Sequence, residues 1–278
     1  MYLISWKKKN ISVKMLVKAV IAQFLIAVIL VKVPAGRYVV SKVSDAVTSV
    51  INCGQDGLSF VFGSLADSTA AAGSVFAIQV LGNIVFLSAL VSFLYYIGIL
   101  GFVVKWIGKA VGKLMGTSEV ESFVAVANMF LGQTDSPMPV AMVALVAAVN
   151  KLLGVCGISL QQVFSYVFAP FGFFLGLDPS EILLEGNLLG SKLVLNEFVA
   201  FQQLGGMISS MDYRTGMIFA ISLCGFANFS SLGICVSGIA VLCPEKKSTL
   251  ARLVFKAMLG GVAVSLISAM TVGLVTLC

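Results

Sequence analysis

A few polar side chains stand inside apolar stretches of the sequence, and these are the residues whose types could do chemistry. Glu197 lies in the apolar stretch from Leu193 to Phe201. A carboxylate at membrane depth costs roughly 2.5–3.5 kcal/mol on insertion scales, so it needs a compensating partner or a water-filled cavity. Lys192 is near along the chain, but it lies five residues away, on a different helix face. We therefore favour a functional role for Glu197 over a structural one.

Two further polar groups interrupt apolar stretches. The first is Gln133-Thr134-Asp135, at the end of a short apolar helix, and the second contains Phe226, Asn228, Ser230 and Ser231. Taken singly, each residue has a simpler explanation: a turn for Asp135, a satisfied helix end for Gln133 and Thr134, and helix packing for Asn228 and the serines. Phe226 alone would face lipid or a core. Together, these carboxylates, amides and hydroxyls suit a polyhydroxylated ligand with amide-like edges, and the phenyl ring suits a flat or sugar-like face.

The composition is that of a membrane protein. The 278 residues are 59% hydrophobic and 11% charged, whereas soluble domains carry roughly 25% charged residues. Long continuous apolar runs predict helices and not the short alternating strands of a barrel. The net charge of +6 comes from basic residues beside the spans, which favours the positive-inside rule over nucleic-acid binding.

The residues that are absent restrict the chemistry. The chain has no histidine, its six cysteines form no CxxC pair, and no P-loop or dinucleotide-binding glycine motif occurs. We therefore expect no enzyme and no cofactor, and we give a disulfide framework little weight.

The apolar runs predict the order of the membrane elements. Spans are expected at about 12–35, 75–100, 138–155, 213–243 and 250–277. A loop with Asp45 and Asp56, and then the short apolar segment 58–65, are expected after the first span. Within 102–115, lysines recur every four positions opposite Trp106, which predicts a basic amphipathic helix lying in the interface plane. The lysines before the first span predict a cytoplasmic N-terminus.

Two short helices begin with capping residues and acids. The first starts at Ser118-Glu119-Val120-Glu121, runs to Leu131 and ends in the polar stretch 132–137. The second starts at Asp178-Pro179-Ser180-Glu181 and meets Asn196-Glu197. Short helices that end in polar tips are typical of the re-entrant segments of secondary transporters with inverted repeats.

The predicted fold is therefore an all-α integral membrane protein, with transmembrane helices, re-entrant helical hairpins and a broken helix in an incomplete inverted repeat. We expect four parts: N-terminal spans and interfacial helix as a scaffold (1–115), first hairpin arm and tip (116–137), span and connecting helix (138–178), and a C-terminal transport half (179–278).

Several motifs resemble those of the concentrative nucleoside transporter family. They are Glu121-Ser122-Phe123 leading to Asn128 and to Gly132-Gln133-Thr134-Asp135-Ser136-Pro137, then Lys192-Leu193-Val194-Leu195-Asn196-Glu197-Phe198-Val199-Ala200, and finally Leu223-Cys224-Gly225-Phe226-Ala227-Asn228-Phe229-Ser230-Ser231-Leu232-Gly233. The stretch Leu58 to Leu65 is also similar, and the resemblance covers most of the chain from about residue 15.

The resemblance implies a homotrimer in the cell membrane that takes up nucleosides with a sodium or proton gradient. In that family the first hairpin tip contacts the base, which falls on Gln133, Thr134 and Asp135. The second tip contacts the ribose, which falls on Glu197. The broken helix adds an aromatic, an amide and a hydroxyl, which fall on Phe226, Asn228 and Ser231. The resemblance also implies a sodium site at Asn128 and the carbonyl of Leu131.

Two departures from the family pattern are visible. Asp135 stands where the family usually has Glu, so the carboxylate is about one methylene shorter. After Pro137 the chain goes almost directly to the span at 138–155, and the family's earliest spans are also expected to be missing before residue 12. Half of one repeat would then be absent. The alternative function is therefore a non-transporting membrane scaffold or binding relic, or a truncated fragment of a transporter.

Overall fold

The computed structural model describes residues 12–66, 76–131, 147–155 and 157–277, and these residues form helices and no strand. The chain divides into two compact units, one made of residues 1–31 with 133–278 and the other of residues 32–132. The helical class that the sequence predicts is confirmed, whereas the functional division at residues 115, 137 and 178 stays a prediction.

Two helices of the first unit are long and apolar enough to cross a membrane, and the sequence predicted both. They are α1, Val13–Val31, and α12, Lys247–Leu277, which the short turn at Pro244 precedes. Ala27 and Val31 of α1 pack against Val272 and Val275 of α12. The Gln23 side-chain amide donates a hydrogen bond to the Ser268 hydroxyl, at 2.7 Å, so the two spans are joined by a polar bond within an apolar contact.

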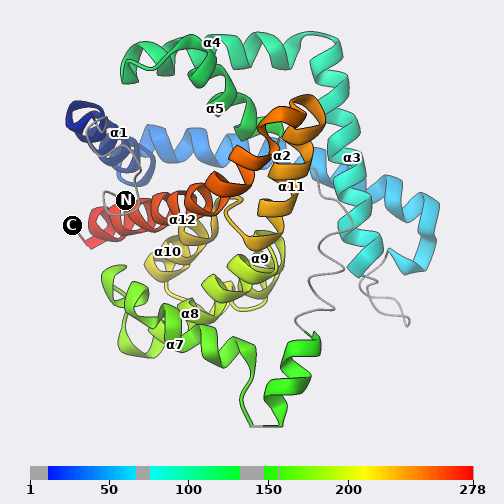
Figure 1. The fold of residues 1–278 in the computed structure, drawn as a ribbon, viewed down its shortest axis with the longest axis vertical. Helices are drawn as coiled ribbons and strands as arrows, with labels where there is room; N and C mark the ends of the chain where they lie inside the picture. The colour runs from blue at the N-terminus through cyan, green and yellow to red at the C-terminus, as the bar shows by residue number, and fades with distance from the viewer. Residues whose placement is uncertain (1–11, 67–75, 132–146, 156, 278) are drawn as a thin grey trace. The chain divides into compact units, whose positions relative to one another are not determined.

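The remaining helices of this unit are short (Figure 1). They are α7 (Leu160–Phe174), α8 (Pro179–Val194), α9 (Glu197–Gly205), α10 (Tyr213–Leu223) and α11 (Phe229–Leu242), and residues 147–154 are also helical. The predicted second short helix is α8, which begins at Pro179 without a side-chain cap from Asp178. The predicted broken helix is α10 followed by α11, with residues 224–228 between them.

The core of the first unit lies among α8, α9, α10 and α12. Its most buried side chains include Leu188 of α8, Leu204 of α9, Phe219 of α10 and Ala269 of α12. Two glycines of α8, Gly186 and Gly190, allow close contact with α7, because a Cβ at either would collide with Ser165 or Phe164. One face of α8 is therefore fixed against α7, and another is turned toward α10 and α12.

The second unit corrects one prediction. The residues expected to form a loop and then a short apolar segment belong to one continuous helix, α2, Pro34–Phe62, followed by the turn Gly63–Leu65. Asp45 and Asp56 lie within that helix. Pro34 occupies the first helical position, where a missing N–H costs nothing, and no further proline interrupts the sequence before Gly63, which has a positive φ of 56°.

The predicted second span and interfacial helix are α3, Phe76–Tyr96, and α4, Ile99–Met115, with a 79° bend between Val85–Tyr96 and Ile99–Met115. In α4, Lys105, Lys109 and Lys113 are exposed, whereas Leu100 and Val104 pack against Val126 and Ala127 of α5. The predicted helix and its exposed lysines are confirmed, but Trp106, on the predicted apolar face, is also 60% exposed. The position in the membrane interface stays a prediction.

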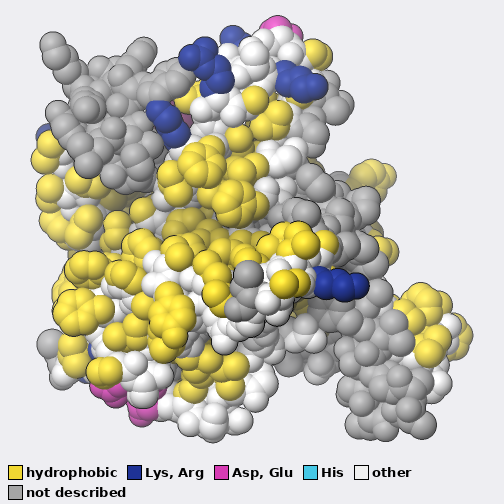
Figure 2. All heavy atoms as spheres, turned by 60° about the horizontal axis from the view of Figure 1, so that its bottom comes forward, with side chains coloured by type: hydrophobic (Ala, Val, Ile, Leu, Met, Phe, Trp, Pro, Cys, Tyr) yellow, Lys and Arg dark blue, Asp and Glu magenta, His cyan; other side chains and the backbone are white. Residues whose placement is uncertain are grey.

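The short helix α5, Glu119–Leu131, has the predicted bounds and the predicted start. The Glu121 backbone N–H donates to the Ser118 hydroxyl at 3.2 Å, and the Ser118 N–H donates to the Glu121 carboxylate at 3.1 Å. These reciprocal bonds are a capping box. Apolar side chains cover much of the described surface of the protein (Figure 2), as a chain with lipid as its solvent requires.

Candidate functional site

The interruption between α10 and α11 is the centre of the candidate site. The helix α10 ends at Leu223, Cys224 is extended, and Gly225 has a φ of 112°, a conformation that L side chains rarely adopt. The next helix begins after Asn228. An interruption inside an apolar run leaves the last carbonyls of one helix and the first N–H groups of the next without helical partners. Buried groups of this kind need other partners.

Lys192 of α8 satisfies the carboxyl end of α10. Its side chain is completely buried, and its ammonium group donates to the carbonyl of Ser222 at 2.9 Å, the carbonyl of Cys224 at 3.3 Å and the hydroxyl of Ser265 at 3.0 Å. Ser265 belongs to α12. A cation at a helix C-terminus also opposes the negative end of the helix dipole. Lys192 therefore joins three helices at the interruption.

Two asparagines cap the helix N-termini on either side of the site. The Asn196 side chain accepts from Val199 N–H at 2.9 Å and starts α9, and the Asn228 side chain accepts from Ser231 N–H at 2.8 Å and starts α11. The amide of Asn228 also donates to the carboxylate of Glu197, at 2.8 Å. A carboxylate in the first turn of α9 is favoured by the helix dipole. The bond between Glu197 and Asn228 therefore connects two helix starts.

Ser230 and Ser231 add further hydrogen bonds between α11 and its neighbours. The Ser230 hydroxyl donates to the carbonyl of Leu195, at 3.2 Å, which ties α11 to the junction of α8 and α9. The Ser231 hydroxyl is within hydrogen-bond distance of the carbonyl of Phe226 and of the side-chain oxygen of Asn228. Asn228 and both serines are buried, whereas the Phe226 side chain is 41% exposed. The site thus has a buried polar frame with a half-buried carboxylate and an exposed ring.

The structure brings together four of the residues that the sequence singled out, namely Glu197, Phe226, Asn228 and Ser231. The partner of Glu197 is Asn228, and Lys192 binds the end of α10 instead. Sequence reasoning missed this use of Lys192, because a lysine that donates to carbonyls from a distant segment leaves no local pattern. It also missed Glu185, a fully buried carboxylate seven residues earlier in α8. The signal was present: two ionisable residues nearly two helical turns apart share a face.

The other predicted residues are not tested. Gln133, Thr134 and Asp135 lie outside the described residues. Asn128 and Leu131 belong to the last turns of α5, and their side chains also lie outside the description. The base contacts and the sodium site therefore stay predictions.

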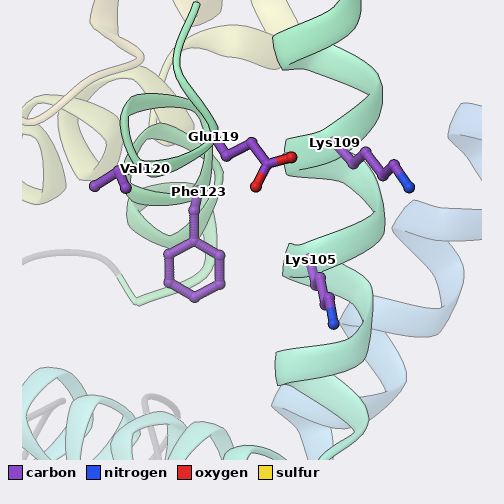
Figure 3. Close-up of a pocket in the computed structure, with 6 residues that line it drawn as sticks. Lys105, Lys109, Glu119, Val120 and Phe123 are labelled. Carbon is purple, nitrogen blue, oxygen red and sulfur yellow. The ribbon is translucent and has the colours of Figure 1, made fainter.

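A cavity of about 430 Å³ lies between α4 and α5 in the second unit (Figure 3). Lys105, Lys109, Glu119, Val120 and Phe123 line it together with Gly108. None of these residues belongs to the predicted substrate site, and the cavity is lined by the exposed basic face of α4. We do not assign it to the substrate.

Comparison with protein families matches both ends of the chain. Residues 136–273 match the family described as Na+ dependent nucleoside transporter C-terminus, and residues 1–65 match the corresponding N-terminus. An uncharacterized transporter of Haemophilus influenzae is 29% identical over 98% of this chain and 94% of its own length. The nucleoside permease NupC of Helicobacter pylori is 26% identical over 99% of this chain and 95% of its own length.

A solved structure of a doubly substituted CNTnw in an outward-facing state is 25% identical, covers 99% of this chain and 94% of that chain, and has a TM-score of 0.90. The alignment with the Haemophilus relative runs over 390 positions, more than the 278 residues of this chain. The relative therefore carries residues that this chain lacks, and most of them lie inside the matched span. The two family matches together cover most of the sequence. The chain belongs to the concentrative nucleoside transporter family.

Proposed function

We propose that the protein takes up nucleosides across a membrane, driven by a cation gradient. The observation that carries this proposal is the hydrogen bond of 2.8 Å between Glu197 and Asn228, which joins two helix N-termini at the interruption of an apolar helix. Half-helix ends at an interruption are the groups that transporters use to bind substrates and coupling ions. The family match and the names of the relatives support the same substrate class.

The chemistry of the site suits a ribose. The Glu197 carboxylate is an acceptor-only group with several lone-pair directions, so it can accept from adjacent ligand hydroxyls as well as from Asn228. The bond from Asn228 fixes the carboxylate before substrate arrives, which lowers the ordering cost of binding. The exposed Phe226 ring can cover an apolar face of the ligand.

The remaining assignments follow from the family resemblance. The base would contact Gln133, Thr134 and Asp135, and a sodium ion would be held by Asn128 and the carbonyl of Leu131. Sodium is the coupling ion we propose, because the matching family is described as Na+ dependent. We also propose a homotrimer in the cell membrane with a cytoplasmic N-terminus, as the lysines before the first span favour.

Uptake of labelled uridine into vesicles, with sodium or choline outside, tests the proposal. We expect sodium-dependent uptake by the parent chain. Glu197→Gln should raise the uridine Kd roughly 10- to 100-fold, because a hydrogen bond to a charged group contributes about 1.5–3 kcal/mol. Glu245→Gln, an exposed glutamate beside α12, is the matched control. Unchanged uridine binding by Glu197→Gln would show that the site assignment is wrong.

A second candidate function is nucleoside binding without transport. The observation that favours it is the set of residues that the relatives carry within the matched span and this chain lacks. Uridine binding that Glu197→Gln weakens, together with uptake that no ion gradient stimulates, would support this alternative. Absence of both binding and uptake would contradict both functions.

A further inference from the structure

Glu185 is a buried carboxylate that the proposed substrate site does not use. It lies in the middle of α8, its exposed fraction is 0%, and neither of its carboxylate oxygens has a hydrogen-bond partner. An ionised carboxylate in such surroundings loses its hydration and gains no hydrogen bond in return, whereas a neutral carboxylic acid loses far less. Glu185 therefore differs from Glu197, whose carboxylate accepts a hydrogen bond from Asn228.

Lys192 does not compensate Glu185 by direct contact. A lysine ammonium group has three N–H donors, and the three acceptors of Lys192 are the carbonyls of Ser222 and Cys224 and the hydroxyl of Ser265. The Ser265 hydroxyl itself donates to carbonyls of α12, so it can only accept from Lys192. Each of the three partners therefore accepts a hydrogen bond from Lys192. Three donated bonds require the three N–H groups of a charged ammonium, so no N–H is left for Glu185.

The Ser222 hydroxyl lies close to Glu185, but its hydrogen is directed elsewhere. It is completely buried and donates to the carbonyl of Phe219, at 2.8 Å. A serine hydroxyl has one hydrogen and two lone pairs, so Ser222 in this orientation can accept a hydrogen bond and cannot donate a second. Ser222 therefore gives an ionised Glu185 no hydrogen bond.

Apart from Lys192, no charged group on α8 or on the described helices packed against it acts on the Glu185 carboxylate. The elements packed against α8 are α7, α9, α10, α11 and, through Lys192, α12. The titratable and charged groups on α8 and on these elements, with those at their ends, are Tyr166, Asp178, Glu181, Lys192, Glu197, Asp212, Tyr213, Arg214, Cys224, Cys235, Cys243, Lys247, Arg252 and Lys256. Of these, Lys192 is the charged group that acts on Glu185.

We propose that Glu185 is a proton-binding site of this protein, separate from the substrate site, and that it holds a proton in the conformation described. Lys192 links the two sites, because it binds the end of α10 and acts electrostatically on both Glu185 and Glu197. If the segment between α10 and α11 moved, the carbonyls of Ser222 and Cys224 would leave the Lys192 ammonium group. The ammonium group could then interact with Glu185 and favour loss of its proton. The consequence for transport rests on the proposed function, whereas the presence of the proton does not.

Infrared spectroscopy of the full chain in vesicles at neutral pH tests the proton directly. We expect the carbonyl band of a protonated carboxylic acid, shifted in heavy water, in the parent and in the control Glu245→Gln. The band should disappear in Glu185→Gln and persist at a shifted position in Glu185→Asp. Absence of the band from the parent, or its full presence in Glu185→Gln, would overturn the proposal. Failure of Glu185→Gln to fold would also overturn it, because glutamine has the shape of the neutral acid.

Uridine uptake at constant sodium and varied external pH tests the consequence. The parent should change its uptake by up to about tenfold per pH unit, the limit for one proton per cycle, and Glu185→Gln should lose this dependence while still binding uridine. Identical pH profiles for parent and variant would contradict a role in transport. If the parent takes up no uridine, the proposed function fails, and the infrared result alone decides whether Glu185 binds a proton.

Discussion

Two interruptions of apolar helices in the described part of the chain are satisfied in different ways. Between α3 and α4 the chain bends by 79° at Gly98, and the bonds found there are between backbone groups, such as Phe102 N–H to the carbonyl of Gly98. Between α10 and α11, side chains from α8, α9 and α12 supply the bonds. The first interruption is exposed, with Tyr96 88% exposed. In the second, the side chains that supply the bonds are buried, with Lys192 0% and Asn228 2% exposed, although Phe226 is 41% exposed.

This difference shows at which interruption polar side chains are held in fixed positions. Backbone groups at an exposed bend can be satisfied by solvent or lipid headgroups, so no side chain has to be placed there. Buried polar groups at an interruption must be satisfied from within the protein, and each buried side chain that does so is held in a defined position. The same requirement that keeps α10 and α11 stable therefore also orders Glu197 and Asn228 for a ligand.

We expect the largest difference in stability between the two regions when a lysine is replaced in each, Lys192 near α10 and Lys109 in α4. Lys192→Met leaves the buried carbonyl of Ser222, the part-buried carbonyl of Cys224 and the Ser265 hydroxyl without this donor, so we expect a loss of roughly 3 kcal/mol or more in the free energy of unfolding. Lys109→Met on the exposed face of α4 should change it by less than about 0.5 kcal/mol. Thermal unfolding in detergent measures both, and equal effects would contradict the comparison.

The bond between Glu197 and Asn228 can be tested while the helix cap is kept. Asn228→Asp retains a good cap for α11 but puts a second carboxylate against Glu197, so we expect a loss of about 1.5–3 kcal/mol. Adding Glu197→Gln should recover part of this loss, because the glutamine amide can donate to the new aspartate. A double-mutant cycle on unfolding free energies measures the coupling, and additive effects would show that the bond contributes nothing.

Two glycines allow the backbones of the interruptions to be compared directly. Neither Gly225 nor Gly98 has an atom within 4 Å of an added Cβ, so substitution by alanine tests conformation alone. Gly98 has a φ of 83° and Gly225 a φ of 112°, which is farther from the left-handed region that L residues can reach. We expect Gly225→Ala to cost about 1–3 kcal/mol and Gly98→Ala about 1–2 kcal/mol at most. A larger effect at Gly98, measured by thermal unfolding, would reverse this ranking.

Much of the helical order was predictable, because apolar length and capping residues are local signals. The starts at Ser118 and Pro179 and the interruption before Asn228 follow from such signals. The loop expected around Asp45 was wrong, because two acids were given more weight than the absence of any proline between Pro34 and Gly63. The interactions of Lys192 could not be predicted, since its acceptors lie 30 or more residues away along the chain.

The smallest expected effect concerns an exposed group, Glu121 at the start of α5. Hydrogen bonds from the backbone N–H and hydroxyl of Ser118 lower the pKa of the Glu121 carboxyl. Because the pKa is lower in the folded state, the stabilisation is present above the unfolded-state pKa and is lost as the pH falls through the folded-state value. Hydrogen exchange in the first turn of α5 should therefore quicken in acid in the parent more than in Glu121→Gln, whose amide can still close the capping box. Glu119→Gln, in the same exposed turn, is the control and should behave like the parent. If Glu121→Gln retained the acid sensitivity of the parent, the exposed bonds at Ser118 would carry no measurable stability, and the contrast with the buried side chains that bridge α10 and α11 would become sharper.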